Sequence, residues 1–258
     1  MGGLSNAFAV VRRGVSLVVD AVLPPLCLSC GAAVGAAGML CPACWSKLVW
    51  LGPPQCDGCG LPFEFDPRIG AGTEELRCAA CLRERPAFDR ARAVFQYDET
   101  SRGLVLGFKH ADRTHMSPAF GRWLARAGRD LLAAADLVAP VPLHWLRLAW
   151  RLYNQSAMIA AVAAAESGRR HIPDLLQRRR YTPQQGDLGP AARRRNVRGA
   201  FRVNPRHRAL VDGARIVLVD DVFTTGATVA ECARTLQEAG AAAVDVLTLA
   251  RVVRPAHV

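Results

Sequence analysis

One stretch constrains the fold of this chain more than any other, Arg215–Leu236, which reads RIVLVDDVFTTGATVAECARTL. It contains four consecutive aliphatic residues, Ile216–Val219, and such a run is typical of a strand that is covered on both faces in a parallel sheet. Two acids and a loop of small residues follow, and the loop leads into a segment rich in Ala and Leu that favours a helix. The stretch therefore predicts a strand–loop–helix unit of an α/β fold.

The predicted loop has the features of an anion site. Its residues are Val222, Phe223, Thr224, Thr225, Gly226, Ala227 and Thr228. A loop of small residues before a helix presents backbone N–H groups and the positive end of the helix dipole to an anion, most naturally a phosphate. The three threonines add hydroxyl donors, and Gly226 lets the backbone approach the ligand closely.

The acids Asp220 and Asp221 make a plain phosphate site inadequate, because carboxylates repel a phosphate unless they bind something else. Ribose hydroxyls next to a 5′-phosphate, or a magnesium-bound group, satisfy both the loop and the acids. In open α/β sheets ligands bind beyond the carboxyl ends of the strands, which is where these residues are expected. The alternative is an ordinary strand–helix unit whose polar strand end binds no ligand.

Size and charge set broad limits. A chain of 258 residues with 51% hydrophobic content is sufficient for one large domain or two modest ones. A net charge of +11 suits nucleic acid, anionic membranes or phosphorylated small molecules as partners, without deciding among them.

The N-terminal residues 1–25 are predicted to form an amphipathic helix, since valines recur there at helical spacing. Arg12, Arg13 and Asp20 interrupt this segment, so no apolar run is long enough to cross a bilayer. We expect a cytoplasmic protein whose N-terminal helix packs on the protein itself, with peripheral membrane contact as the alternative.

Eight of the nine cysteines form four C-x-x-C pairs within residues 26–85. The pairs are Cys27/Cys30, Cys41/Cys44, Cys56/Cys59 and Cys78/Cys81. Two such turns complete a tetrahedral site of four sulfurs, which Zn²⁺ prefers, so the sequence predicts two structural zinc ions in a double zinc ribbon. Sequential pairing is the simplest arrangement and an interleaved one remains open; redox motifs are the rival interpretation. Proline-rich loops with few aliphatic residues indicate that metal supplies the folding energy of this segment.

Residues 86–89 are expected to form a linker, and residues 90–254 a second domain with a parallel sheet flanked by helices. Its expected elements are a strand over 92–97, a helix over 117–134, a central strand over 136–141, a helix that ends near Gly168, and a short strand over 200–203.

Basic and amide side chains surround the predicted strand ends. Lys109 lies at the basic tip of a helix, and Arg147, Arg151, Asn154 and Gln155 follow the central strand, where they are suited to hold a second phosphate group; a solvated helix face is the alternative. The most polar stretch, residues 175–201, includes Arg178 and Arg180 and has the composition of a mobile loop suited to close over a pyrophosphate. A nucleic acid contact would have the same composition.

The sequence IVLVDDVFTTGAT resembles the motif by which type I phosphoribosyltransferases bind 5-phosphoribosyl 1-pyrophosphate (PRPP). Together with the cysteine pairs, the Lys109 segment and the motifs that follow the central strand, it resembles the ComF family of competence-associated proteins, which have a double zinc ribbon before a phosphoribosyltransferase domain.

The resemblance implies PRPP with Mg²⁺ as the ligand and transfer of the phosphoribosyl group to an acceptor, with release of pyrophosphate. It implies that Asp220 and Asp221, with Arg178 and Arg180, act in catalysis, and that the loop residues 222–228 bind the 5′-phosphate. It also implies a role in DNA uptake during natural transformation, with single-stranded DNA and other competence proteins as partners. A PRPP-sensing or DNA-binding protein without catalysis is the alternative function.

Overall fold

The computed structural model describes residues 24–66, 75–110, 113–143, 153–180 and 189–253. The chain divides into two compact units, Met1–Leu48 and Val49–Val258. The predicted N-terminal helix over residues 1–25 falls almost entirely outside the described residues.

The first unit contains one described helix, α2 (Pro42–Trp45). Cys41 precedes its first turn and Pro42 occupies the first helical position, where a missing N–H costs no hydrogen bond. The short helix thereby turns the pair Cys41 and Cys44 toward one side.

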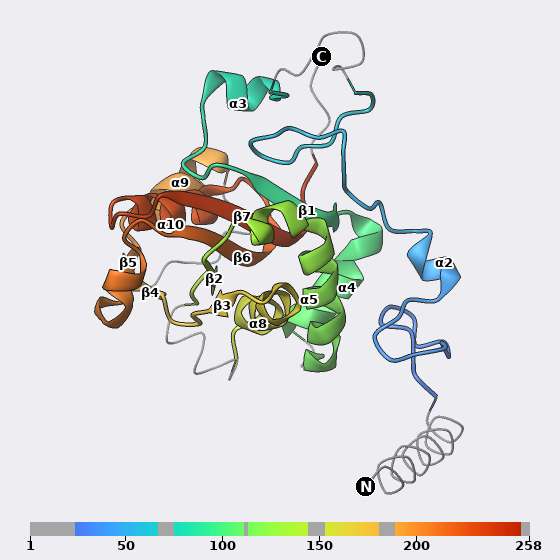
Figure 1. The fold of residues 1–258 in the computed structure, drawn as a ribbon. Helices are drawn as coiled ribbons and strands as arrows, with labels where there is room; N and C mark the ends of the chain where they lie inside the picture. Colours follow the sequence, from blue (N-terminus) through green and yellow to red (C-terminus); the bar gives the residue numbers. More distant parts are fainter. Residues whose placement is uncertain (1–23, 67–74, 111–112, 144–152, 181–188, 254–258) are drawn as a thin grey trace, which may run out of the picture. The chain divides into compact units, whose positions relative to one another are not determined.

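The second unit contains a parallel sheet of five strands in the order β1-β7-β6-β2-β3 (Figure 1). The strands are β1 (Ala91–Gln96), β2 (Leu137–Pro140), β3 (Arg170–His171), β6 (Arg215–Phe223) and β7 (Ala243–Arg251). All nine residues of β7 are buried, as expected of a central strand covered on both faces. The prediction of a parallel α/β sheet is confirmed.

Helices cover both faces of the sheet. Helices α5 (Ser117–Ala127) and α8 (Gln155–Ser167) pack on one face, and α10 (Ala227–Gln237) packs on the other with α9 (Pro190–Val197) beside it (Figure 1). The remaining helical elements are α3 (Ala79–Arg83), α4 (Glu99–His110), η1 (Thr114–Met116), α6 (Arg129–Ala133) and η2 (Pro205–Leu210).

Two strands outside the main sheet, β4 (Leu176–Arg178) and β5 (Phe201–Val203), pair with each other in antiparallel register. Strand β4 lies within residues 175–201, the stretch that the sequence predicts to be a mobile loop, and β5 begins at the last residue of that stretch. Part of that stretch is the helix α9, which the prediction missed; Gly189 and Pro190 provide a favourable start, and alanine and arginine favour its continuation. Residues 181–188 lie outside the described residues.

Candidate functional site

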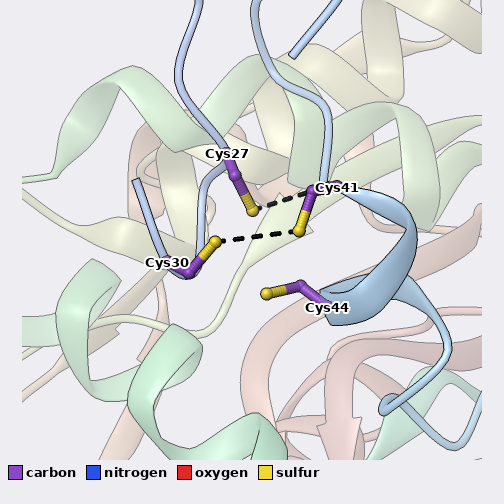
Figure 2. Close-up of side chains that lie close together, drawn as sticks. All are labelled: Cys27, Cys30, Cys41 and Cys44. Atoms are coloured by element: carbon purple, nitrogen blue, oxygen red, sulfur yellow. Dashed lines mark hydrogen bonds between the residues drawn. The ribbon is translucent and has the colours of Figure 1, made fainter. Parts of the chain in front are cut away.

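The first cysteine cluster comprises Cys27, Cys30, Cys41 and Cys44, whose four sulfurs point toward one another (Figure 2). The Sγ atoms of Cys30 and Cys41 lie 3.7 Å apart. The backbone N–H of Cys41 donates to the Sγ of Cys27 at 3.3 Å, which favours a thiolate there.

The second cluster comprises Cys56, Cys59, Cys78 and Cys81, and all four residues are buried. The Sγ atoms of Cys59 and Cys78 lie 3.6 Å apart. The N–H groups of Cys59 and Cys78 donate to the Sγ of Cys56 at 3.4 and 3.3 Å. These cysteines belong to the same buried cluster as residues of the sheet and of α10, so this part of the zinc ribbon shares the core of the second unit.

Both clusters fit zinc. Within each one the four sulfurs lie within 4.8 Å of one another. A tetrahedral site with Zn–S bonds of about 2.3 Å places its sulfurs about 3.8 Å apart, close to the separations in both clusters. The first two pairs form one site and the last two the other, which confirms two sites with sequential pairing. Four sulfur ligands leave no open position, so both sites are structural.

The topology indicates which edge of the sheet is the candidate ligand-binding edge. The chain leaves β2 for β3 on one side, whereas it leaves β6 for β7 on the other, although β2 and β6 are neighbours. In open α/β sheets such a switch point creates a crevice at the carboxyl ends of the two strands. Asp220 and Asp221 lie in the last half of β6, and therefore at this edge.

The two acids are held by three different elements. The Oδ1 of Asp220 accepts from the Ser156 hydroxyl at 3.1 Å and from the N–H of Asp221 at 2.9 Å. The Oδ2 of Asp221 forms an ion pair with Lys109 Nζ at 2.8 Å, and its Oδ1 accepts from the N–H of Val222 at 2.7 Å. Lys109 and the acids are more than a hundred residues apart in the sequence, and the fold brings them together at one strand end.

Burial and the neighbouring charge of Asp221 raise the pKa of Asp220 from 3.8 to about 7. Desolvation is the largest cause, and hydrogen bonds from Asp221 N–H and Ser156, together with the Lys109 charge, oppose it. A carboxyl group that titrates near neutral pH at a strand end is typical of a functional site.

The loop between β6 and α10 is shorter than the sequence predicts. Strand β6 continues to pair with β7 through Phe223, and α10 begins at Ala227, so the loop that the sequence predicts to bind a phosphate consists of Thr224–Gly226 (hereafter the phosphate loop). Gly226 has φ 73°, a left-handed conformation that favours glycine. The first N–H groups of a helix have no acceptors within it, and that of Ala227 donates to the Thr225 hydroxyl at 3.4 Å.

Asn154 and Gln155 have partners within the fold. The Asn154 side chain accepts from the N–H of Ser156 at 3.1 Å, capping α8, and donates to the carbonyl of Val141 at 3.1 Å. Gln155 is buried and donates to the carbonyl of Lys109 at 2.9 Å. Both amides therefore connect α8 to the elements that bear the site, and their direct contact with a ligand stays a prediction.

The predicted pyrophosphate residues are placed only in part. The Arg178 guanidinium lies 5.3 Å from the centre of the Phe201 ring, and Arg180 donates to the carbonyls of Asn196 and Arg198 at 3.0 and 2.9 Å, at the end of α9. Arg147 and Arg151 lie outside the described residues.

A hollow of about 740 Å³ opens at the carboxyl end of β2. It is lined by Pro142 and Leu143 after that strand, by Asn154 at the start of α8, and by Arg178 and Arg202 of the strand pair β4–β5. Ser156, two residues after Asn154, holds Asp220. The hollow and the acid pair therefore meet at the first turn of α8.

Comparison with known proteins relates both cysteine clusters and the sheet to described families. Residues 18–82 match the double zinc ribbon domain, and residues 148–256 match the phosphoribosyl transferase domain. The DNA utilization protein YhgH of Salmonella typhi is 36% identical over 202 residues, which cover 76% of this chain and 83% of that protein.

The YhgH protein of Escherichia coli K12 is 33% identical over 237 residues, covering 89% of this chain and 98% of that protein. Competence protein F of Haemophilus influenzae is 28% identical over 206 residues, covering 76% of this chain and 90% of that protein. The chain belongs to the ComF family. Among the described residues of this ComF-family chain, no helix combines the length and apolar character that a membrane span requires.

Two features of this ComF site were not predicted from the sequence. The Ser156 hydroxyl donates a hydrogen bond to Asp220. In the sequence Ser156 directly follows Asn154 and Gln155, but this position is informative only once that pair is known to begin a helix. The contacts of Arg251 with Cys59 and with the Phe223 ring have no signal in the sequence, because 192 residues separate Arg251 from Cys59.

Proposed function

We propose that this protein binds PRPP with Mg²⁺ and transfers its 5-phosphoribosyl group to an acceptor, with release of pyrophosphate. The observation that carries the proposal is the acid pair Asp220–Asp221 directly before the phosphate loop, at the switch point of a parallel sheet. A phosphorylated sugar has an anion for the loop and a diol for the acids, and it therefore fits both parts of the site.

Each part of the site has a proposed task. Residues Thr224–Thr228 bind the 5′-phosphate through N–H groups and hydroxyls, as the first turn of α10 favours an anion. Asp220 and Asp221 accept hydrogen bonds from the ribose hydroxyls and stabilise positive charge that develops at the anomeric carbon. Arg147, Arg151, Arg178 and Arg180 are proposed for the pyrophosphate, with Lys109 beside them. Mg²⁺, when bound with PRPP, neutralises phosphate charge on the leaving group.

The proposed reaction breaks the bond between the anomeric carbon and pyrophosphate and forms a bond from that carbon to the acceptor, which loses a proton. Most of the rate enhancement comes from positioning and from electrostatic stabilisation of an oxocarbenium-like state. The raised pKa of Asp220 supports this assignment, because an incompletely compensated carboxylate gains most from a nearby cationic centre.

Calorimetry with PRPP and Mg²⁺ tests the binding step. Wild-type protein is expected to release or absorb heat on binding, and the double variant Asp220→Asn, Asp221→Asn is expected to lose affinity at least about tenfold. Asp130→Asn is the matched control, since Asp130 lies on α6, before β2, and forms ion pairs with Arg90 and Arg92 at 3.8 and 3.7 Å. Equal binding by the double variant would refute the assignment.

Turnover is tested by pyrophosphate release with a panel of nucleobases and amines against a control without acceptor. Acceptor-dependent release supports a transferase. Binding of PRPP with no release under any acceptor instead supports the alternative, a PRPP-sensing protein without catalysis.

A second function is favoured by the relatives, whose names refer to DNA utilization and competence. We propose that the protein acts in the cytoplasm in DNA uptake and contacts single-stranded DNA or other competence proteins. The exposed arginines Arg194, Arg195 and Arg198 at α9 provide a basic surface for phosphates.

Single-strand affinity is expected to fall steeply with salt and to weaken on chelation of zinc. Arg194→Gln with Arg195→Gln is expected to reduce both the affinity and the salt dependence. Arg122→Gln with Arg126→Gln, two exposed arginines on α5, is the matched control. Undetectable or salt-insensitive binding would argue against DNA as a direct partner.

A further inference from the structure

The second cysteine cluster and the phosphate loop are joined by a short series of contacts within one compact unit. Arg251, the last residue of β7, is 7% exposed. Its guanidinium donates to the carbonyl oxygen of Cys59 and, from Nη2, to the Sγ of Cys59 at 3.5 Å. A residue of the sheet edge that bears the site thus hydrogen-bonds a ligand atom of the second metal site.

The same guanidinium lies over the ring of Phe223, 4.7 Å from its centre. Phe223 is the last residue of β6 and is paired with Arg251 across the sheet. Cation–π contacts of this kind gain strength when they are removed from water, as these two buried side chains are.

The Phe223 ring in turn lies directly against the phosphate loop. A Cβ atom placed on Gly226 would approach the Cζ atom of Phe223 to 2.6 Å, so the ring occupies the space next to that glycine. The Phe88 ring packs edge-on against Phe223, with centres 5.9 Å apart, and restricts the ring further. A displacement of Phe223 would therefore alter the room available to Gly226.

The charge of a metal bound at the second cysteine cluster would act on Arg251, and through it on Phe223 and Gly226. A divalent ion with four thiolates carries a net negative charge, which compensates the buried guanidinium of Arg251. Loss of the metal releases the Sγ of Cys59 from the site, so the atom to which Arg251 Nη2 donates is no longer held in place, and the Arg251 side chain is free to move.

We propose that Arg251 is a positioning residue that couples metal occupancy of the second cysteine cluster to the conformation of the phosphate loop, through Phe223. The proposed consequence, tighter PRPP binding when the second site holds zinc, rests on the proposed function. The coupling itself concerns the loop and is measurable without PRPP. The first cluster, Cys27 to Cys44, belongs to the other compact unit and has no part in it.

Amide hydrogen exchange of the peptide that spans residues 221–230 provides the test, with zinc content measured in the same samples. Arg251→Met keeps the length of the side chain and removes its charge and hydrogen bonds. We expect this variant to exchange about tenfold faster in that peptide while strand β2 is unchanged, as expected for coupling between contacting groups. Arg90→Met is the control, because the Arg90 side chain also pairs with a residue of β7, Asp245, at 2.6 Å, and among the described residues it hydrogen-bonds neither Cys59 nor Phe223.

The role of the metal is tested by stepwise chelation. In wild-type protein, loop exchange is expected to rise with loss of the second zinc, and in Arg251→Met it is expected to be already fast and to respond little. Cys30→Ser, in the first cluster, is expected to lose one zinc without a change in the loop. Loop exchange in Arg251→Met equal to that of the wild type, with both zinc ions bound, would overturn the proposal.

Phe223→Leu provides a second variant if Arg251→Met fails to fold. The double variant Arg251→Met, Phe223→Leu is expected to add little to either single change, since both act through one contact; additive effects would also overturn the coupling. Affinity for PRPP is then measured by calorimetry. Altered loop exchange without any PRPP binding would disprove the proposed function and leave the coupling intact.

Discussion

We predict that the negative charge of Asp220 lowers the free energy of unfolding of the protein. The substitution Asp220→Asn measures by how much. The substitution removes the charge and keeps an Oδ1 acceptor for the Ser156 hydroxyl and for the N–H of Asp221. Because the pKa of Asp220 rises from 3.8 in an unfolded chain to about 7, the folded protein binds more protons than the unfolded chain between these values. Wild-type stability therefore falls as the pH rises through this window, and the variant does not share that loss.

The magnitude follows from the two pKa values. The full shift corresponds to about 4 kcal/mol above pH 7.5 and to about 3 kcal/mol at pH 6. Solvent reaches this half-buried residue and screens its charge, so we expect the variant to be more stable by about 2 kcal/mol at pH 8.5 and by about 1 kcal/mol at pH 6.

Urea unfolding at these two pH values measures the difference, with zinc content checked at the lower one because metal binding to thiolates is pH-dependent. Asp130→Asn is the control and is expected to change stability by less than about 0.5 kcal/mol at both values. A variant no more stable than the wild type at pH 8.5, or a gain that does not shrink at pH 6, would refute the electrostatic reasoning.

Three further predictions follow from single contacts. Gly226→Ala is expected to destabilise the protein by about 1–2 kcal/mol in urea unfolding, because its φ is 73° and the new methyl group meets the Phe223 ring; unchanged stability would contradict the loop geometry. Lys109→Met is expected to raise the pKa of Asp220 further, since the Lys109 charge lowers it, and carboxyl-carbon NMR titration would detect the shift. Native mass spectrometry is expected to find two zinc ions per chain, and Cys81→Ser is expected to retain one; a single zinc ion in the wild type would contradict the two-site assignment.

The sequence predicted the elements whose signals are local. Four aliphatic residues before two acids indicated the central strand β6, and sequential C-x-x-C pairs indicated the grouping of the two metal sites. The predicted helix over 117–134 is divided at Gly128, where the chain lies so close to the sheet that a Cβ would meet both Cδ atoms of Leu247 at 2.7 Å. Leu247 lies on a strand more than a hundred residues away in the sequence, so the hydrophobic pattern of residues 117–134 could not predict this close approach.

The same limit applies to the candidate site. Residues 86–89 have the composition of a linker, yet Phe88 is 4% exposed and packs on Phe223, because the segment leads directly into β1 beside the core of the second unit. The antiparallel pair β4–β5 joins segments that are separated by the least regular part of the sequence. The residues of the acid pair and of the phosphate loop could be predicted from the sequence. The contacts that Ser156, Phe88 and Arg251 make with them or with their neighbours depend on the tertiary fold and could not be predicted.

The site is most informative where its interactions oppose one another. Adjacent carboxylates at the end of a buried strand repel each other, and the fold offsets this only in part, with one lysine, one hydroxyl and two backbone N–H groups. A purely structural strand end would be more stable with a neutral residue at position 220, since burial and the charge of Asp221 both disfavour the ionised carboxylate. Retention of a charge that raises the free energy of the folded state is expected where a ligand supplies the missing partner. A sugar diol or a developing cation is such a partner, and this is why the stability of Asp220→Asn bears directly on function.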